Sequence, residues 1–307
     1  MNKITIILST HNGAAYLQSQ LDSLTSQSIK EFSIIARDDG SIDNSCEIFQ
    51  NFMKHSSLDA IILEEKTNLG VKKSFELLMH KALLFDTHYI IFADQDDVWD
   101  SEKVEKTYLK MQELEHIYGL TTPVLVHSDL TVVDASLNVL ASSFWQYQHI
   151  DSSKDSLYHF LLNNIVTGCT MMINRALAEK IKTIPTEAIM HDWWIAMVAS
   201  VFGKIGYINE PLILYRQHGD NNTGATQYGF QYFVKKFFAK PSFRKYINQS
   251  KAFLELYSKE LNENDRKMLE EFSSFGELTK CQKLKILYKY KIWKNGFMRN
   301  LGLIFFA

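Results

Sequence analysis

Cysteine is scarce in this sequence, which has Cys46, Cys169 and Cys281 among its 307 residues. Three cysteines cannot all pair, and none stands in a CxxC spacing, so the sequence excludes a disulfide framework and a zinc ribbon. Free thiols are typical of a reducing cytosol. We therefore interpret the three cysteines as core or surface thiols.

Long apolar runs are also missing. No stretch reaches the roughly 18 to 20 consecutive apolar residues that a membrane-spanning helix needs. Residues 1–9 include an apolar segment that is too short for the apolar region of a signal peptide. We expect a cytoplasmic protein without a targeting segment.

Neither sign of charge dominates the chain, whose formal net charge of −2 argues against binding to nucleic acid. The charge is nevertheless uneven, because residues 235–307 contain 16 Lys and Arg against seven Asp and Glu. With 46% apolar residues, the chain can bury a large core. We predict two parts, a catalytic domain over residues 1–225 and a basic helical region over residues 226–307.

Both common glycine-rich phosphate-binding loops are absent. The sequence contains neither GxxxxGK(S/T) nor GxGxxG, so neither a P-loop nor the dinucleotide-binding fingerprint holds phosphate groups. A phosphate-bearing ligand would therefore need a metal ion to hold it.

The strongest local signal is a cluster of acids after an apolar segment. Tyr89 to Phe92 is typical of a buried strand, and Asp94, Asp96 and Asp97 follow it. Three carboxylates repel one another unless a cation lies among them, and divalent cations such as Mg²⁺ prefer oxygen ligands. A solvated turn is the alternative. We favour a site in which Asp94-x-Asp96 holds Mg²⁺ or Mn²⁺, and the bound metal clamps a diphosphate.

Strands and helices alternate over the first 100 residues. Apolar segments at 4–8, 32–36, 61–63 and 89–92 predict strands, and helical spacing of apolar residues follows the first three. This pattern predicts an α/β fold with a mainly parallel sheet covered by helices on both faces. In such a sheet, the polar segments after the strands should line one crevice.

Those polar segments include Thr10 to Gly13 and Asp38 to Ser41. Asp38 and Asp39 could accept hydrogen bonds from a nucleobase or a ribose. Asp-Gly-Ser is also a turn-forming sequence, and Ser41 could cap a helix. We favour ligand binding for Asp39 and leave both interpretations open for Asp38 and Ser41.

Seven segments resemble, in order and spacing, the inverting family 2 glycosyltransferases of bacteria, which have a GT-A fold. They are Ile7 to Gly13, Asp38 to Asp43, Asn68 to Gly70, Asp94 to Asp97, Thr167 to Cys169, His191 to Trp194 and Tyr215 to Asn221. The resemblance covers about residues 3–224 and is nearest to the rhamnosyltransferase-like branch that acts on surface polysaccharides. Residues 226–307 resemble nothing that we can assign.

The resemblance implies a nucleoside-diphosphate-sugar donor, either dTDP-rhamnose or a UDP-sugar. Donor-binding roles fall on Thr10, Asn12, Asp38, Asp39, Asn68, Asp94 and Arg216, with Asp39 at the nucleobase and Asp94 at the ribose. Asp96 and His218 would hold Mg²⁺ or Mn²⁺ at the phosphates. Asp192 would be the catalytic base, in a motif where the family more often has glutamate at the position of His191.

Elementary chemistry requires the same parts. Displacing a nucleoside diphosphate from an anomeric carbon needs charge stabilisation on the leaving group and a base for the incoming hydroxyl on the opposite face. Asp192 opens an apolar helical stretch at 193–202, so it could instead be a first-turn acid stabilised by the helix dipole. The two roles are compatible, and we favour the base.

The acceptor-side candidates are Asp97, Asp129, Trp193 and Trp194. The two tryptophans are adjacent, so on a helix they point about 100° apart. We expect one of them in the core and the other against a sugar ring. Asp129 follows a predicted strand at 124–126.

Arg216 and His218 follow a strand-like segment at 212–215. Arg216 could pair with phosphate or form an ordinary surface ion pair. A lone histidine is most often a surface residue or a satisfied core residue, and we weigh that equally with a metal-binding role for His218.

The segment 101–118 carries an apolar stripe at helical spacing, formed by Val104, Tyr108, Met111, Leu114 and Tyr118. We interpret the stripe as core packing. The Lys and Glu residues between its members are interpreted as a solvated face.

The carboxyl-terminal region has helical patterns over 230–238, 243–261 and 268–275. Its last segment, 280–307, has seven Lys and Arg and no acid, with aromatic residues on one predicted helical stripe from Ile286 to Phe297. Basic and aromatic residues together favour docking on an anionic membrane surface. Packing on the catalytic domain or a homodimer contact is the alternative.

We therefore predict a GT-A enzyme that uses a divalent metal to transfer a sugar, with inversion, to a saccharide acceptor. We expect a lipid-linked acceptor at the inner face of the cell membrane. One alternative is a metal-dependent nucleotidyltransferase, which would release pyrophosphate. The other is a non-catalytic nucleotide-sugar-binding protein.

Overall fold

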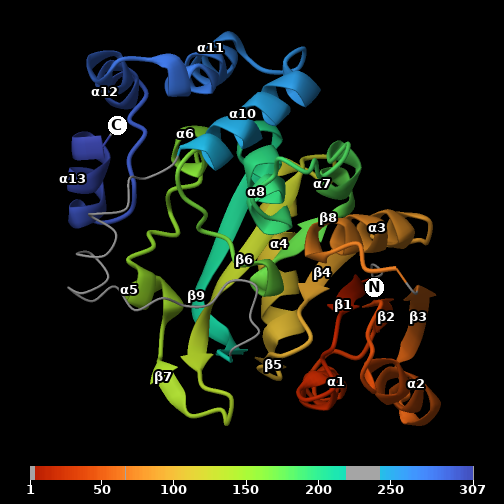
Figure 1. The fold of residues 1–307 in the computed structure, drawn as a ribbon. Coiled ribbons are helices and arrows are strands. Elements are labelled where there is room, and N and C mark those ends of the chain that lie inside the picture. The colour runs from red at the N-terminus through yellow and green to blue at the C-terminus, as the bar shows by residue number, and fades with distance from the viewer. Residues whose placement is uncertain (1–3, 66, 219–242, 307) are drawn as a thin grey trace.

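The computed structural model describes residues 4–65, 67–218 and 243–306 (Figure 1). Within these ranges nine strands form one sheet, in the order β3-β2-β1-β4-β8-β6-β9-β5, with β7 paired to β6. The strands are β1 (Ile4–Thr10), β2 (Phe32–Asp39), β3 (Asp59–Glu65), β4 (Tyr89–Ala93), β5 (Val98–Trp99), β6 (Val124–Val133), β7 (Val139–Ala141), β8 (Met172–Asn174) and β9 (Lys204–Arg216).

The sheet has a parallel half and a mixed half. Strands β3, β2, β1 and β4 run parallel to one another, whereas β8 is antiparallel to both β4 and β6, and β5 is antiparallel to β9. The α/β class and the mainly parallel first half are therefore confirmed. Because β1, β2 and β4 run in one direction, the polar segments that follow them all lie at the same side of the sheet, where the carboxyl ends of these strands meet.

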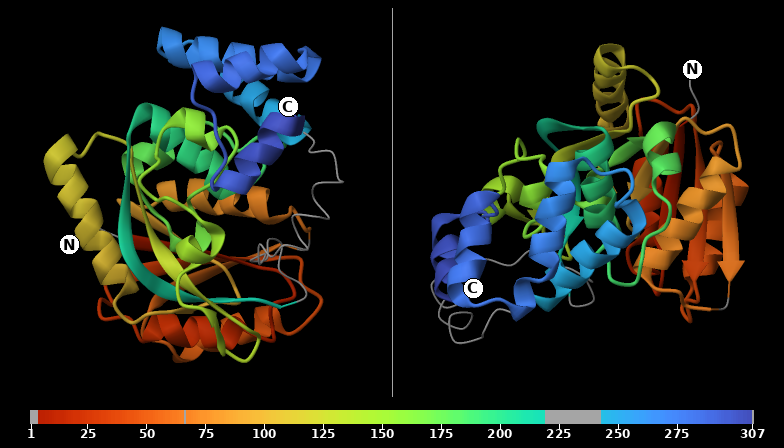
Figure 2. Two further views of the ribbon diagram at one scale, coloured as in Figure 1. Left: turned by 90° about the vertical axis from the view of Figure 1, so that its left-hand side faces the viewer. Right: turned by 90° about the horizontal axis from the view of Figure 1, so that it is seen from above.

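Helices cover both faces of the sheet (Figure 2). One face carries α1 (Leu17–Thr25), α2 (Ser45–His55) and α4 (Lys103–Tyr118), and the other carries α3 (Val71–Leu83), α7 (Arg175–Lys180) and α8 (His191–Phe202). The pleat of β1 explains the two layers, since Ile6 and Leu8 belong to the first core and Ile7 to the second. Shorter helices, α5 (Phe144–Gln148), α6 (Leu157–Phe160), η1 (Gly168–Thr170) and η2 (Phe275–Glu277), complete the connections.

The carboxyl-terminal helices pack on the α8 face. They are α10 (Arg244–Tyr257), α11 (Glu263–Ser273), α12 (Lys280–Lys289) and α13 (Phe297–Phe306), and Figure 1 shows α10 lying across the end of α8. The ring of Trp194 on α8 is 5.3 Å from that of Phe253 on α10. Leu287 and Leu303, from α12 and α13, are buried in the same hydrophobic cluster. One core thus serves the sheet and these helices.

Several predicted boundaries were wrong. Strand β2 continues to Asp39, because β3 supplies hydrogen-bonding partners as far as Glu65. Strand β6 continues to Val133, so Asp129 lies inside it. The stripe predicted from Ile286 to Phe297 is interrupted, since α12 ends at Lys289 and the chain turns with positive φ angles at Lys291 and Gly296. The pattern predicted at 230–238 lies outside the described residues.

The cysteines and the apolar character of the helices bear on two expectations from the composition. Cys46, Cys169 and Cys281 are free thiols, as predicted. Among the described helices, none has the length and apolar character needed to cross a bilayer.

Candidate active site

A glutamine between the acids joins the loops that follow β1 and β4. The Gln95 side-chain oxygen accepts hydrogen bonds from the Thr10 hydroxyl at 2.8 Å and from the His11 backbone N–H at 2.7 Å. Its amide nitrogen donates back to the His11 carbonyl at 3.2 Å. Thr10, a predicted donor-binding residue, thus helps to hold the two loops together.

Asn12 and Asp38 shape the turn after β2. The Asn12 side-chain oxygen accepts from the Ile42 N–H at 2.9 Å, and its backbone has a positive φ of 50°. Asp38 accepts hydrogen bonds from the backbone N–H and the hydroxyl of Ser41. These contacts match the turn-forming interpretation of Asp38 and Ser41.

Asp39 is buried and supports the neighbouring turn. Its carboxylate accepts from the backbone N–H groups of Leu69 at 2.7 Å and Gly70 at 2.8 Å, and it pairs with the buried guanidinium of Arg37. The Asn68 side-chain oxygen also accepts from Gly70, at 2.9 Å. A carboxylate has about four acceptor positions, so Asp39 keeps capacity for one further partner after these contacts.

The acids after β4 lie in three different environments. Asp94 is partly exposed, and burial, followed by the charges of Asp96 and Asp192, raises its pKa to about 7. A carboxylate oxygen of Asp96 lies 2.8 Å from Nε2 of His218. Asp97 is fully buried, and burial raises its pKa well above the usual range. Asp94 and Asp192 are distant in sequence, yet both lie next to the segment at Gly168 and Cys169: the Gly168 N–H donates to Asp192, and the Cys169 thiol lies within 4.8 Å of a carboxylate oxygen of Asp94. The predicted donor side and the predicted base are therefore close together.

Arg216 connects the end of β9 to the acidic loop. Its Nε donates to the Asp96 carbonyl at 2.8 Å, and its backbone N–H donates to Asp97 at 3.3 Å. The Tyr16 ring lies 4.7 Å from both the guanidinium of Arg216 and the ring of His218. Arg216 is 4% exposed, which contradicts the alternative of an ordinary surface ion pair.

Asp192 lies in the first turn of α8. One carboxylate oxygen accepts from the Gly168 N–H at 3.0 Å, and the other accepts from the Trp193 N–H at 2.6 Å. The helix-start role left open from the sequence is therefore present. Burial raises the pKa of Asp192 to about 7 despite these hydrogen bonds. Each oxygen retains acceptor capacity.

His191 is held between aromatic rings. Its imidazole stacks on Phe75 at 4.4 Å and on Phe92 at 5.8 Å, and burial lowers its pKa to about 3. A Cβ atom at Gly168 would lie 2.9 Å from His191 Nε2. Gly168 therefore permits the close approach of this loop to α8.

Among the described residues, Asp94, Asp97 and Cys169 have ligand atoms within 4.8 Å of one another, the spacing of a metal site. Asp96 and His218 form a second, smaller set, a carboxylate oxygen and a ring nitrogen at 2.8 Å from each other. Carboxylates suit Mg²⁺ or Mn²⁺, whereas a thiol suits softer metals. The Asp94-x-Asp96 side is therefore the better fit to the predicted ion.

The sequence profile described as Glycosyl transferase family 2 matches residues 5–182, which is more than half of the chain. The chain belongs to this family. It is a glycosyltransferase that takes its sugar from a nucleotide sugar.

Curated relatives of the glycosyltransferase agree with this assignment. A protein named dTDP-rhamnosyl transferase RfbG, from Shigella flexneri, is 24% identical over 71% of this chain and 74% of its own length. A putative teichuronic acid biosynthesis glycosyltransferase, TuaG of Bacillus subtilis, is 26% identical over 69% of this chain and 78% of its own length.

Solved structures support a GT-A fold for the glycosyltransferase. S. aureus TarS, solved in complex with UDP-GlcNAc, has a TM-score of 0.60 at 15% identity and covers 94% of this chain and 80% of its own. A mannosyltransferase from Pyrobaculum calidifontis, solved with GDP-Man and Mn²⁺, has a TM-score of 0.52 at 14% identity and covers 93% of this chain and 73% of its own.

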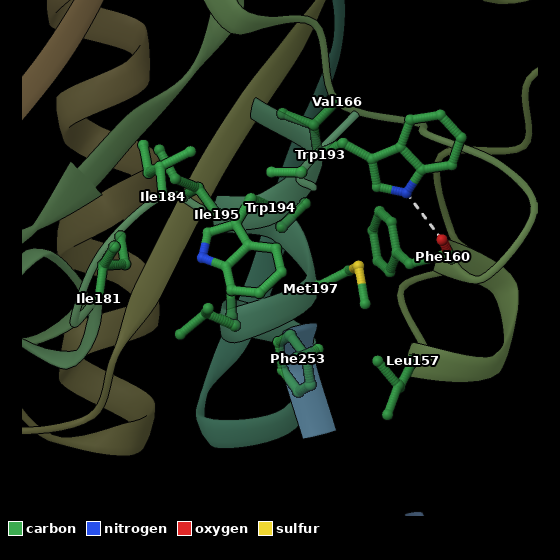
Figure 3. Packing of buried hydrophobic residues seen from close by; sticks show 14 of the residues in the cluster. Leu157, Phe160, Val166, Ile181, Ile184, Trp193, Trp194, Ile195, Met197 and Phe253 are labelled. Carbon is green, nitrogen blue, oxygen red and sulfur yellow. Dashed lines mark hydrogen bonds between the residues drawn. The ribbon is translucent and has the colours of Figure 1, made fainter. Parts of the chain in front are cut away.

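The adjacent residues Trp193 and Trp194 of the glycosyltransferase are both buried. Trp194 is 0% exposed and lies in the core, as predicted for one of the pair. Trp193 is 8% exposed, and its indole N–H donates to the Phe160 carbonyl at 2.7 Å (Figure 3). The Tyr246 ring lies 5.9 Å from that of Trp193. The predicted stacking of one tryptophan on a sugar ring gains no support from this burial and stays a prediction.

Asp129 has a structural environment in the glycosyltransferase. Its carboxylate accepts from the Ser143 hydroxyl and from the backbone N–H of Trp145 at 3.1 Å. These contacts tie the start of α5 to β6. These structural contacts do not support the predicted acceptor-side role of Asp129, which stays a prediction.

One lysine in segment 101–118 of the glycosyltransferase does not lie on a solvated face. Lys103 is 0% exposed, although the Lys and Glu residues of this segment were interpreted as a solvated face. Its Nζ lies 3.6 Å from the centre of the Trp99 ring. The apolar stripe gave no signal for this burial, because Lys103 reaches into the sheet edge from the first turn of α4.

Proposed function

We propose that this glycosyltransferase is metal-dependent and transfers a sugar, with inversion, to a saccharide acceptor of a bacterial surface polysaccharide. The observation that carries the proposal is that adjacent residues of one short segment reach both acids: the Gly168 N–H donates to Asp192 at 3.0 Å, and the Cys169 thiol lies within 4.8 Å of a carboxylate oxygen of Asp94. It links the acidic loop, suited to a metal-bound diphosphate, with a carboxylate suited to receive a proton. Those are the two parts that displacement at an anomeric carbon requires.

Asp96 and His218 would hold a divalent cation, Mg²⁺ or Mn²⁺, with Asp94 beside them. When bound, such an ion neutralises charge that develops on a diphosphate leaving group. The absence of a phosphate-binding glycine loop from the sequence supports this assignment. The mannosyltransferase neighbour solved with GDP-Man and Mn²⁺ supports it further.

Asp192 would accept the proton of the acceptor hydroxyl. Its carboxylate is held at both oxygens by backbone N–H groups, from Gly168 and Trp193, so it is oriented before the acceptor arrives. A pKa of about 7 makes it a stronger base than an ordinary aspartate, while it stays ionised in part of the molecules at neutral pH. Attack from the side of Asp192, opposite the diphosphate, gives inversion.

The donor would lie along the loops after β1, β2 and β3. Asp39 retains an acceptor position for a nucleobase N–H, and Asn68 shares its turn. Thr10, Asn12 and Asp38 maintain the wall of this crevice through their contacts with loop residues. The name of the Shigella relative makes dTDP-rhamnose the first donor to test, and the TarS neighbour makes UDP-sugars the second.

The acceptor would be lipid-linked, and the carboxyl-terminal helices would dock on the inner face of the cell membrane. Phe297, Met298 and Phe305 are 77%, 53% and 62% exposed, within a segment that has seven Lys and Arg and no acid. Exposed aromatic rings together with cationic side chains suit an anionic lipid surface. A homodimer contact is the other use of such a surface.

A donor panel tests this proposal. Purified protein is heated with each nucleotide sugar and Mn²⁺ or Mg²⁺. A donor at about 100 times its dissociation constant should stabilise the protein by about 2.7 kcal/mol. Turnover must then release a nucleoside diphosphate. Pyrophosphate release would identify a nucleotidyltransferase, and donor binding without turnover on any acceptor would identify a non-catalytic binding protein.

An Asp96→Asn variant tests the metal requirement. We expect it to keep the thermal stability of the wild type without ligands and to lose nearly all transfer activity. Asp100→Asn, an exposed acid nearby, is the matched control and should remain active. Wild-type activity of Asp96→Asn in the presence of a chelator would contradict the metal mechanism.

A further inference from the structure

The segment that connects α7 to α8, residues 181–190, has no regular secondary structure, and it ends shortly before Asp192. Backbone N–H and C=O groups inside a protein need hydrogen-bonding partners. In a segment without helix or strand, side chains of neighbouring elements must supply many of them. Two helices do so here: α3, which covers the sheet, and α10, the first described helix of the carboxyl-terminal region.

Helix α3 holds the segment with charged side chains. The buried carboxylate of Glu76 accepts a hydrogen bond from the Ile184 N–H at 2.7 Å. Farther along, Nζ of Lys72 donates to the carbonyls of Thr186 and Ala188, both at 2.7 Å. A lysine ammonium has three donors, so one side chain can bind two carbonyls at once. Helix α3 therefore fixes the second half of the segment.

Helix α10 contacts the same segment. Gln249 is 1% exposed, and its side-chain oxygen accepts from the Ile189 N–H at 2.7 Å. The Tyr257 hydroxyl accepts from the Lys182 N–H at 3.3 Å. Glu260, which follows α10, pairs with the Lys182 ammonium at 2.6 Å. Contacts from the carboxyl-terminal region thus reach both ends of the segment.

Lys72 and Gln249 hold one and the same peptide group. The Ala188 carbonyl and the Ile189 N–H belong to a planar trans peptide, in which the two groups point in opposite directions. Lys72 therefore holds this peptide from one side and Gln249 from the other. Helices α3 and α10 together fix a rigid unit that lies just before Asp192 in the chain.

The position of this peptide sets the start of α8. The Met190 carbonyl accepts the first hydrogen bond of the helix, from the Trp194 N–H at 3.1 Å. Asp192, in the first turn, accepts from the Gly168 N–H at 3.0 Å. A shift of the 188–189 peptide would therefore move the Asp192 carboxylate relative to the Gly168 loop. A displacement of about 1 Å can cost about 100-fold in rate.

We propose that Gln249 and Lys72 are positioning residues that hold the Ala188–Ile189 peptide and thereby place the Asp192 carboxylate for proton transfer. This inference rests on the proposed role of Asp192 as the base. It gives the carboxyl-terminal region a part in catalysis that does not depend on membrane docking.

The test compares Gln249→Met and Lys72→Met with two controls, each made in the wild type and in Asp192→Asn. Ser250→Ala removes a buried hydroxyl that bonds within α10, and Lys81→Met removes a cation from the last turn of α3. The first measurement is kcat for release of nucleoside diphosphate from dTDP-rhamnose or UDP-GlcNAc, whichever turns over. The second is the dissociation constant of dTDP or UDP with Mn²⁺, by calorimetry.

We expect Gln249→Met and Lys72→Met each to lower kcat at least about tenfold and to leave the nucleoside-diphosphate dissociation constant unchanged. The controls should keep both values. In Asp192→Asn, neither substitution should lower kcat further, because a residue that acts through the base has no effect once the base is gone. If Gln249→Met does not fold, Lys72→Met decides, since it removes the other hydrogen bond to the same peptide.

Unchanged kcat in either folded variant would overturn the inference. An equal fall in kcat in the Asp192→Asn background would also overturn it, because the effect would then not pass through the base. Wild-type kcat in Asp192→Asn, or no turnover with either donor, defeats the proposed function instead. Hydrogen exchange of the 189–194 amides then decides the positioning separately: faster exchange in both variants supports it, and unchanged exchange overturns it.

Discussion

Asp192 would combine the proposed role of base with a structural role at the start of α8. Its position in the first turn of α8 and its two backbone hydrogen bonds favour the ionised carboxylate. Burial disfavours that ion more strongly, so the pKa rises to about 7. A carboxylate with this pKa is oriented by the helix start and basic enough to take a proton at neutral pH.

We expect Asp192→Asn to lower the rate of sugar transfer by roughly 10²- to 10⁴-fold, the usual contribution of a positioned base. Asparagine keeps the size of the side chain and one acceptor oxygen, so donor binding and its metal dependence should stay near wild type. Single-turnover transfer rates and donor titration measure the two effects. Weakened donor binding with an unchanged chemical step would instead give Asp192 a donor-side role.

The elevated pKa of Asp192 also predicts how stability depends on pH. The folded protein binds this proton more tightly than the unfolded chain, in which an aspartate titrates near its model value of 3.8. The stabilisation is complete below pH of about 4 and is lost as pH rises through about 7. The free energy of unfolding of the wild type, relative to Asp192→Asn, should therefore fall over that interval in denaturant titrations. A flat difference would show that Asp192 has an ordinary pKa.

At the scale of single elements, α12 and α13 each have a buried side and an exposed side. Leu287 of α12 and Leu303 of α13 lie in the core, whereas Tyr288 of α12 and Phe297, Met298 and Phe305 of α13 are exposed. Asn295 adds a link to the catalytic region, since its N–H donates to the Asn163 side chain at 3.0 Å. Deleting residues 280–307 would therefore open the core, and surface substitutions are the better test of membrane docking.

We expect the triple variant Phe297→Ser, Met298→Ser and Phe305→Ser to lose binding to vesicles that contain phosphatidylglycerol while it keeps the thermal stability of the wild type. The remaining cations contribute roughly 1 kcal/mol each near an anionic surface, so residual binding should weaken as salt is raised. Flotation with phosphatidylglycerol and with phosphatidylcholine vesicles measures this.

The matched control for that variant is Leu109→Ser with Leu120→Ser, two leucines that are 56% and 70% exposed on and after α4. Equal loss of vesicle binding in the control would mean that exposed apolar area anywhere on the protein drives the interaction. A triple variant that changes from dimer to monomer in light scattering, with no effect on vesicles, would identify the surface as a homodimer contact.

At the scale of the whole molecule, described residues on either side of the predicted division at residue 225 share one hydrophobic cluster. Phe253 and Tyr257 of α10 pack against Trp194 of α8, at 5.3 and 6.4 Å between ring centres. Buried residues of α12 and α13 extend the same cluster. The carboxyl-terminal region can thus differ from the rest of the chain in surface charge and still share its hydrophobic core.

We expect one cooperative unfolding transition because the helices after residue 243 share their core with the sheet. Trp194→Ala should lower the stability of that single transition by about 3–5 kcal/mol, the usual loss for a large buried aromatic residue. Circular dichroism and tryptophan fluorescence during denaturation measure it. Two transitions, with only one shifted by the substitution, would support the division into domains at residue 225 that the sequence suggested.

Much of the site could be predicted from the sequence because its parts obey local rules. Polar residues directly after parallel strands must meet at one edge of the sheet, and this places Thr10, Asp38 and Asp94 near one another. Asp192 could be located from its motif and its helix start. The sequence could not predict that the Asp39 carboxylate accepts a hydrogen bond from the turn at 68–70, because this contact depends on how β2 and β3 pair.

The sequence by itself determined the α/β class, the order of strands and helices in the first 100 residues, and the acids at the carboxyl ends of the strands. Periodicity and turn chemistry depend on neighbours in the chain, so the sequence carries them directly. Only the tertiary structure decided that Lys103 is buried against the Trp99 ring, that Trp193 and Trp194 are covered, and that α12 and α13 divide between core and surface. Burial depends on which distant segments pack together, and a charged residue at the start of a helix shows no local sign of it.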